Sequence, residues 1–288
     1  MQQVKAIPAL RDALARWRHE RERVALVPTM GNLHSGHMVL IERAQQLAHR
    51  TVVSIFVNPM QFVRGEDFDS YPRTPEQDLL GLAEAGVDLV FLPDAADLYA
   101  GDLERTTYVK VPALDDILCG KFRPGHFTGV ATMVTKLLNL VLPDIAVFGD
   151  KDYQQLLVIR RLVADLCLPV DVIAVPTARD VDGLAHSSRN SYLTRSERRR
   201  ASLLFKTLKQ VAAALRASEG NWAELEAQAT QRLQKGGFRV DYLSVRRAKD
   251  LMPPSPQDTH LVVMAAAWLG RTRLIDHVEV SWEEGCAA

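Results

Sequence analysis

The stretch VALVPTMGNLHSGH, residues 24–37, decides the fold expected of this chain. It starts as an apolar run, typical of a buried parallel strand, and breaks into a turn that carries His34 and His37. Gly31 and Gly36 permit close approach of the backbone, and the apolar spacing after Gly36 becomes helical. A strand, a loop and the start of a helix therefore meet here. Such a junction directs unpaired amide N–H groups and the positive end of a helix dipole toward one place, which favours a phosphate.

The two histidines are open to two chemical interpretations. A His-x-x-His pair can be half of a zinc site, but no further ligand follows it closely at the spacing of a metal motif. The imidazoles can instead hydrogen-bond to phosphate oxygens. Because either histidine could also be purely structural, the interpretation as a nucleotide site depends on other parts of the chain.

The composition is that of an ordinary globular protein. The chain has 288 residues, enough for a sizeable core and more typical of two domains than of one. Its 35 basic and 35 acidic residues cancel, so no general field attracts nucleic acid or an anionic membrane. The sequence contains neither a bilayer-spanning apolar run nor a signal-peptide core. Cys119, Cys167 and Cys286 are too far apart for a disulfide framework or a metal motif. We therefore expect a cytoplasmic protein without nucleic-acid or membrane partners.

Short apolar runs alternate with helical patterns along the first 175 residues. After the opening strand, further strands are predicted at residues 51–57, 88–92, 145–148 and 170–175. Helices are predicted at residues 38–48, 75–85, 129–142 and 154–166. This alternation predicts an α/β fold with a mostly parallel sheet covered by helices on both faces.

The segments richest in chemically active residues all follow predicted strands. Residues 28–37 follow the first strand, 58–62 follow the second, and 149–155 follow the strand that ends at Phe148. In open parallel sheets, ligands bind beyond the carboxyl ends of the strands. Each segment alone could be a polar turn, but their shared placement predicts one site built from three loops.

The chain changes character after residue 176. We expect a first domain at residues 1–177, a hinge at 178–184 and a smaller α+β domain at 185–288. Thr194 and Asn221 each resemble a helix cap, the first opening a helix to about Ala217 and the second a helix to Gly236. Strands at 240–245, 261–267 and 273–280 complete a mostly antiparallel sheet. Residues 187–190, Ser-Ser-Arg-Asn, follow the hinge and suit a mobile lid.

Taken together, these motifs resemble the pantothenate synthetase family over nearly the whole chain. The residues that carry the resemblance are Pro28–Gly31 with His34–His37, Asn58–Phe62, Glu66–Phe68, Tyr71–Arg73, Arg123–Phe127, Gly149–Gln155, Ser187–Asn190 and Thr272–Asp276. The resemblance implies a Rossmann-like, cytidylyltransferase-type fold and an AMP-forming ligase that joins (R)-pantoate to β-alanine, in the biosynthesis of coenzyme A. It also implies a pantoyl-adenylate intermediate, release of AMP and pyrophosphate, Mg²⁺ with the ATP, and a homodimer.

The resemblance also implies the roles of individual residues. The ATP-binding positions are Met30, Gly31, Asn32, Leu33, His34, Ser35, Gly36, His37, Gly149, Asp150, Lys151, Asp152, Ala178, His186, Ser187, Ser188 and Arg189. Gln61 and Gln155 occupy the positions that hold the substrates pantoate and β-alanine, pantoate above all. His37 matches the proton donor. His34, His37, Lys151 and Arg189 are the candidate catalytic residues, because each can donate to an α-phosphate on which negative charge grows.

The sequence departs from the family pattern at two positions, and two other classes of protein stay open. His186 stands where methionine is common, and Asp150 where glutamate is common. A nucleotidyltransferase or a small tRNA-charging enzyme of the same fold could also use His-x-Gly-His, although the balanced charge weakens the second. The second class is a non-catalytic protein that keeps the fold, either to bind nucleotide without turnover or as a dimer scaffold.

Overall fold

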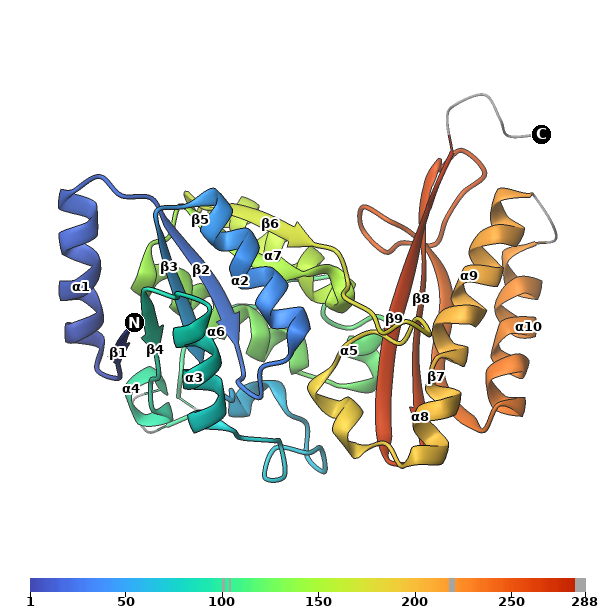
Figure 1. Cartoon of the computed structure of the whole chain (residues 1–288). Helices are drawn as coiled ribbons and strands as arrows, with labels where there is room; N and C mark the ends of the chain where they lie inside the picture. The colour runs from blue at the N-terminus through green and yellow to red at the C-terminus, as the bar shows by residue number, and fades with distance from the viewer. Residues whose placement is uncertain (100–101, 104, 218–220, 283–288) are drawn as a thin grey trace. The chain divides into compact units, whose positions relative to one another are not determined.

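The computed structural model describes residues 1–99, 102–103, 105–217 and 221–282. The chain divides into two compact units (Figure 1). The first unit contains residues 1–150 and 155–176, and the second contains residues 151–154 and the chain from Thr177 onward. The segment 178–184, predicted to be a hinge, is thus part of the second unit, and its role as a hinge stays a prediction.

The first unit is built on a six-stranded parallel sheet. Its strands are β1 (Gln2–Val4), β2 (Val24–Thr29), β3 (Arg50–Ile55), β4 (Leu89–Phe91), β5 (Ile145–Gly149) and β6 (Asp171–Val175). Its helices are α1 (Ile7–His19), α2 (Ser35–Leu47), α3 (Pro75–Glu84), α4 (Ala95–Tyr99), α5 (Cys119–Phe122), α6 (His126–Val141) and α7 (Tyr153–Asp165), with single 3₁₀ turns η1 (Pro59–Gln61) and η2 (Asp150–Asp152). The predicted α/β fold is confirmed.

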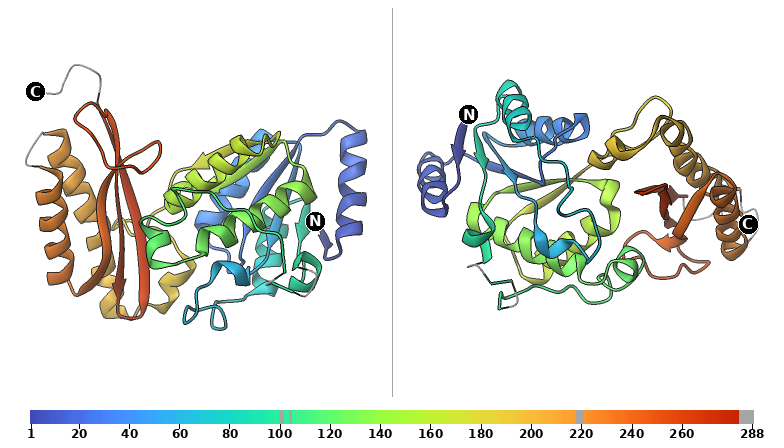
Figure 2. Two further views of the ribbon diagram at one scale, coloured as in Figure 1. Left: turned by 180° about the vertical axis from the view of Figure 1, so that it is seen from behind. Right: turned by 90° about the horizontal axis from the view of Figure 1, so that it is seen from below.

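Helices cover both faces of this sheet. Figures 1 and 2 show α2 and α3 on one face and α6 and α7 on the other. Ala25 and Val27 of β2 pack in one apolar cluster with Ile41 and Ala44 of α2, while Leu26 between them is equally buried. This burial of consecutive residues, rather than alternate ones, explains why β2 appears in the sequence as a continuous apolar run.

The chain reverses its direction of travel across the sheet between β2 and β5. The strand order is β1-β4-β3-β2-β5-β6, so β3 and β4 follow β2 on one side and β6 follows β5 on the other. β2 pairs with β3 at six positions but with β5 only at Ala25 and Leu26. Pro28, which has no amide N–H to donate, comes after the pairing with β5 has ended. The carboxyl ends of β2 and β5 therefore no longer pair with each other at the place where such folds bind ligands.

The second unit is a three-stranded antiparallel sheet with helices packed against it, as predicted. Its strands are β7 (Phe238–Arg247), β8 (His260–Leu269) and β9 (Thr272–Ser281), in that order. Its helices are α8 (Arg195–Ala201), α9 (Leu203–Arg216) and α10 (Trp222–Lys235), with a 3₁₀ turn η3 (Ser188–Tyr192). One apolar cluster joins α9 and α10 to the sheet, with Leu208, Leu233 and Leu261 fully buried.

One helix of the second unit differs from the prediction. A continuous helix from the cap at Thr194 to Ala217 is wrong, because the helix breaks at the buried Ser202 into α8 and α9. Serine is a weak residue for a helix interior, since its hydroxyl competes for backbone hydrogen bonds. The predicted caps are correct: Thr194 and Glu197 form a reciprocal capping box, and Asn221 accepts from the amide of Glu224.

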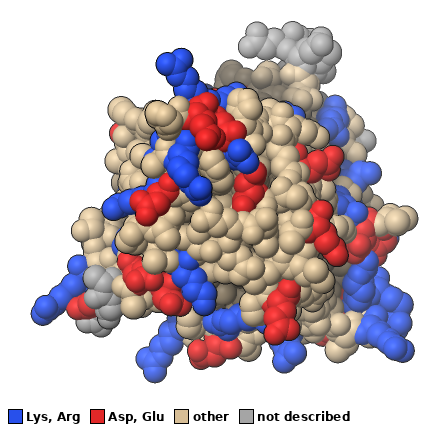
Figure 3. Space-filling view, turned by 60° about the vertical axis from the view of Figure 1, so that its left-hand side comes forward, with Lys and Arg blue, Asp and Glu red and all other residues tan. Residues whose placement is uncertain are grey.

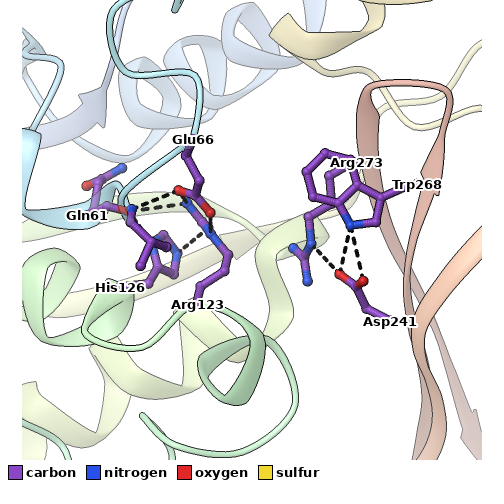
Figure 4. Close-up of polar contacts among 8 residues, drawn as sticks. Gln61, Glu66, Arg123, His126, Asp241, Trp268 and Arg273 are labelled. Carbon is purple, nitrogen blue, oxygen red and sulfur yellow. Dashed lines mark hydrogen bonds and ion pairs between the residues drawn. The ribbon is translucent and has the colours of Figure 1, made fainter.

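A polar cluster lies at an irregularity of the second sheet. The pairing of β7 with β8 shifts between Val240 and Tyr242, which leaves Asp241 between the two registers. Asp241 accepts hydrogen bonds from the indole of Trp268 and from Nε of Arg273, the latter at 2.8 Å (Figure 4). The carboxylate thereby compensates the buried guanidinium of Arg273, whose side chain is only 11% exposed.

The surface carries charges of both signs. On the face shown in Figure 3, basic and acidic side chains are interspersed, in agreement with the cancelling totals of 35 and 35 in the sequence. Among the helices of the described chain, none combines the length and the apolar character needed to cross a membrane.

Candidate active site

The loop between β2 and α2 is held in one shape by an aspartate of α3. The backbone turns through Gly31 and Asn32, which have φ of +76° and +50°. The buried carboxylate of Asp78 accepts from the amides of Asn32 and Leu33, each at 2.8 Å. A Cβ atom on Gly31 would lie 3.0 Å from Oδ2 of Asp78, so glycine is required both for the φ and for the close approach. This clamp fixes the backbone just before the two histidines.

His34 and His37 form the amino-terminal cap of α2. Nδ1 of His34 accepts from the amide of Gly36 at 3.1 Å, and Nδ1 of His37 accepts from the amide of His34 at 3.2 Å. The ring centroids are 4.1 Å apart. Because a backbone amide can only donate, neither Nδ1 carries a proton, and in the neutral rings the proton is on Nε2. Both histidines therefore present an Nε2–H donor.

This geometry corrects one expectation and weakens another. Unpaired amides were predicted at the start of this helix, but the amides of Gly36 and His37 are both paired. The amide of Gly36 donates to Nδ1 of His34, and the amide of His37 donates to the carbonyl of His34. Zinc would have to bind at Nε2, which would move the proton to Nδ1 and break the cap. In the described part of the chain, no three His, Cys, Asp or Glu side chains are grouped closely enough to hold a metal.

Gln61 lies in the turn η1 that follows β3, and its amide group has a fixed orientation. The hydroxyl of Tyr99 donates to Oδ1 of Asn58, so Nδ2 of Asn58 faces Oε1 of Gln61 at 3.2 Å. Burial raises the pKa of the Tyr99 phenol, which keeps it a donor. The Nε2 group of Gln61 consequently points the other way, toward Sδ of Met30 at 2.8 Å. Met30 and Gln61, predicted from separate motifs, lie in contact.

The third predicted segment follows β5. Gly149 and Asp150 end the strand and begin η2 in the first unit, and Gln155 lies on the first turn of α7. Lys151 and Asp152, between them in sequence, group with the second unit. There the hydroxyl of Tyr153 donates to the carbonyl of Ala248 at 3.0 Å, which anchors the segment.

The remaining predicted nucleotide positions lie on a hairpin of the second unit and in the turn η3 that follows it. The amide of His186 donates to the carbonyl of Ala178, so these two predicted ATP contacts are neighbours across the hairpin. Arg179 fastens the hairpin to β9 through a bidentate pair with Asp276, at 2.6 and 2.8 Å. Nε2 of His186 lies 3.0 Å from Oδ1 of Asp180. After the hairpin, Ser187 accepts from the amide of Arg189 and caps η3, which carries Ser188 and Arg189.

The turn of this hairpin depends on an ion pair that titrates in acid. Arg198 donates to Asp182 at 2.6 Å and thereby lowers the pKa of that carboxyl below its ordinary value. A carboxyl with a lowered pKa in the folded state stabilises the protein above its unfolded-state pKa, and this contribution is lost as pH falls through the folded value. Both side chains are 36% exposed, so the stabilisation is that of a surface pair.

We predict that Asp182→Asn lowers the free energy of unfolding at pH 7 by about 0.5–1 kcal/mol. Asparagine keeps an oxygen for the amide of Leu184, which isolates the charge. The deficit should shrink toward zero as pH falls below about 4. Melting temperatures of wild type and variant between pH 7 and 3 test this, and a deficit that does not change with pH would contradict it.

Comparison with known proteins identifies the family of this chain. The family model described as pantoate-beta-alanine ligase matches residues 2–279. The pantothenate synthetase of Methylococcus capsulatus is 56% identical over 272 residues, covering 94% of this chain and 95% of the relative. That of Nitrosococcus oceani is 53% identical over 280 residues, covering 97% and 98%. The chain belongs to the pantoate–β-alanine ligase family.

Solved structures of the family share the fold over the whole chain. The pantothenate synthetase of Thermus thermophilus has a TM-score of 0.91 at 44% identity, covering 98% of this chain and 100% of that one. The ligase of Francisella tularensis, solved with β,γ-ATP and β-alanine, has a TM-score of 0.80 at 31% identity, covering 96% and 97%. The chain is accordingly a ligase of the ATP-dependent pantothenate synthesis reaction.

Three residues that support the site were not found from the sequence. Asp78, Asn58 and Tyr99 contact the loop and the glutamine described above, yet none was assigned a role there. Asn58 stands in a motif that was recognised, so its proximity to Gln61 was a usable signal. Asp78 is 46 residues from Asn32, and Tyr99 is 41 residues from Asn58, so only the folded chain brings them together.

Proposed function

We propose that the ligase works in two steps through an acyl adenylate. The carboxylate oxygen of pantoate attacks the α-phosphorus of ATP, and the bond to pyrophosphate breaks. The amine of β-alanine then attacks the activated carbonyl, the C–O bond to AMP breaks, and the amine loses a proton as the amide forms. Each step builds negative charge on phosphoryl oxygens, so the site needs fixed donors around the α-phosphate.

The histidine pair supplies such donors. Because Nδ1 of each ring accepts a capping hydrogen bond, His34 and His37 carry their protons on Nε2, at the amino-terminal end of α2. These groups lie at the carboxyl end of β2, where pairing with β5 has ended, and next to the positive end of the α2 dipole. We assign both to the ATP phosphates, where His37, the position that matches the family's proton donor, would donate a hydrogen bond from Nε2–H to the developing charge. The other predicted ATP contacts of the same unit would line the nucleotide. They are Met30, Gly31, Asn32, Leu33, Ser35, Gly36, Gly149 and Asp150.

The second unit would add positive charge to the nucleotide. We assign Lys151 and Arg189 to phosphate oxygens, Asp152 to the ribose, and Ala178, His186, Ser187 and Ser188 to the nucleoside. The hydrogen bond from His186 to Asp180 holds an imidazole where the family usually has methionine, so the nucleoside contact would be more polar. A mixed anhydride hydrolyses readily, and closure of the hairpin and η3 as a lid would protect it.

Gln61 and Gln155 would hold pantoate and the incoming β-alanine. Their neutral amides can pair with hydroxyl and carboxylate oxygens, while Met30 and Phe62 offer apolar surface to the gem-dimethyl group. The fixed orientation of Gln61 supports this, because its Nε2 group is a donor and the oxygens of pantoate are acceptors.

Three further assignments complete the proposal. Mg²⁺ would enter as the complex with ATP, since this ion is usually held through substrate phosphates and its own waters. The ligase would be a homodimer, as the family resemblance implies. Sedimentation equilibrium measures this oligomeric state. It would work in the cytoplasm, where a reduced thiol such as that of Cys167 persists.

The observation that carries the proposal is the pair of Nε2–H donors at the switch point of the sheet. We predict that purified protein with ATP, Mg²⁺, pantoate and β-alanine forms AMP, pyrophosphate and the amide in equal amounts, and that omitting pantoate abolishes pyrophosphate release. Chromatography of the products distinguishes the rival classes. A product that retains the nucleotide would indicate an adenylyltransferase, and nucleotide binding without any product would indicate a non-catalytic protein.

A further inference from the structure

A buried ion pair between Arg123 and Glu66 contacts the backbone of Gln61. Nε and Nη2 of Arg123 donate to the two oxygens of Glu66, at 2.5 and 2.7 Å, and the side chains are 13% and 18% exposed (Figure 4). Nη2 of Arg123 also donates to the carbonyl of Gln61 at 3.2 Å. Glu66 in turn accepts from the amide of Val63, which ties the pair to the chain following η1. Buried ion pairs often add little net stability, because desolvation offsets the attraction.

His126 extends this network and its proton position follows from the geometry. Nη1 of Arg123 lies 2.9 Å from Nε2 of His126, and Nδ1 of His126 lies 2.7 Å from the carbonyl of Gln61. A guanidinium can only donate, so Nε2 of His126 accepts and carries no proton. The proton is then on Nδ1, which donates to the carbonyl. His126 thus has the opposite tautomer to His34 and His37.

We propose that Arg123 and His126, fixed by Glu66, are positioning residues for pantoate. They donate two hydrogen bonds to the backbone carbonyl of Gln61, while Asn58 fixes the orientation of the Gln61 side chain. The backbone and the amide of Gln61 are thereby both defined before substrate arrives, which lowers the cost of binding. This inference rests on the assignment of Gln61 to pantoate made above.

Two substitutions of His126 separate its two hydrogen bonds. The Nδ2 group of asparagine can replace Nδ1–H and keep the donor to Gln61, whereas Oε1 of glutamine can replace Nε2 and keep only the acceptor for Arg123. We predict that His126→Gln raises the KM for pantoate about fivefold to tenfold, the effect of losing one buried hydrogen bond. The rise in His126→Asn should be clearly smaller. The KM for ATP should change less than twofold in both.

The measurement is pantoate-dependent pyrophosphate release by the full-length protein, with pantoate and ATP varied separately and Gln61→Ala as reference. Equal rises in the two variants, no rise in His126→Gln, or a parallel rise in the KM for ATP would overturn the inference. If wild type turns over and Gln61→Ala loses affinity for pantoate while His126→Gln does not, only the positioning role fails. If wild type shows no pantoate-dependent release, the proposed function itself fails.

A second measurement does not depend on activity or on the folding of a variant. ¹⁵N NMR of the wild-type imidazoles distinguishes protonated from unprotonated ring nitrogens. We expect a protonated Nδ1 in His126 and a protonated Nε2 in His34 and His37 at neutral pH. A protonated Nε2 in His126 would remove the acceptor for Arg123 and overturn the proposed network.

Discussion

Replacing Gly129 by alanine is expected to destabilise the protein by about 3 kcal/mol or more, although alanine is the better helix former. Gly129 is buried in α6, beside the turn η1 that carries Gln61. A Cβ atom there would lie 2.3 Å from the carbonyl oxygen of Met60 and 2.7 Å from the amide nitrogen of Gln61. Both neighbours are backbone atoms, so relief requires movement of η1 or α6.

The same contact links stability to substrate binding. Nδ2 of Asn58 donates to the carbonyl of Gly129 at 3.0 Å, so displacement of α6 would also disturb the residue that orients Gln61. We therefore expect any folded fraction of Gly129→Ala to have a raised KM for pantoate. Urea unfolding gives the stability, and pyrophosphate release gives the KM.

Gly81→Ala is the matched control. Gly81 is also in a helix, α3, but a Cβ atom there would meet only the flexible Cε of Met38 at an ordinary 3.7 Å. This variant should be as stable as wild type or up to about 1 kcal/mol more stable. If Gly129→Ala were likewise neutral, the close approach of α6 and η1 described here would be wrong.

The parts of the fold that were predicted are those with local patterns. The predicted helix at 75–85 is observed at Pro75–Glu84 and the predicted strand at 145–148 at Ile145–Gly149, because apolar spacing and a proline at the helix start are local signals. The helix α1 was missed although Leu10, Ala13, Leu14 and Trp17 are buried at helical spacing. The edge strand β1 has three residues, too few for any pattern.

The site was predictable only where its residues are close together in sequence. The junction at residues 24–37 contains its own strand, turn and cap, so its geometry follows from the segment itself. The orientation of the two histidines could not be predicted from the segment, because the tautomer depends on which ring nitrogen faces an amide. The supports of Gln61 come from Arg123 and His126, 62 and 65 residues away, and a pattern in one sequence does not show such pairings.

The largest loss of activity is expected from substitutions that keep the cap of α2 but remove the Nε2–H donors. In His34→Asn, the side-chain oxygen can accept from the amide of Gly36 as Nδ1 does, since asparagine is a favoured amino-terminal cap. In His37→Gln, the side chain can reach back to the amide of His34 and restore the capping box. We predict that the rate of adenylation falls by about 10²-fold or more in each variant, because a donor aimed at developing charge is lost.

Alanine variants at the same positions separate the two roles of each imidazole. His34→Ala loses the cap as well as the donor, so it should be about 1 kcal/mol less stable than His34→Asn while having similarly low activity. Thermal unfolding and pyrophosphate release measure the two effects independently. If His34→Asn retained near-normal adenylation, the histidine would serve the helix alone. The phosphate donors would then have to be sought among other residues of the site.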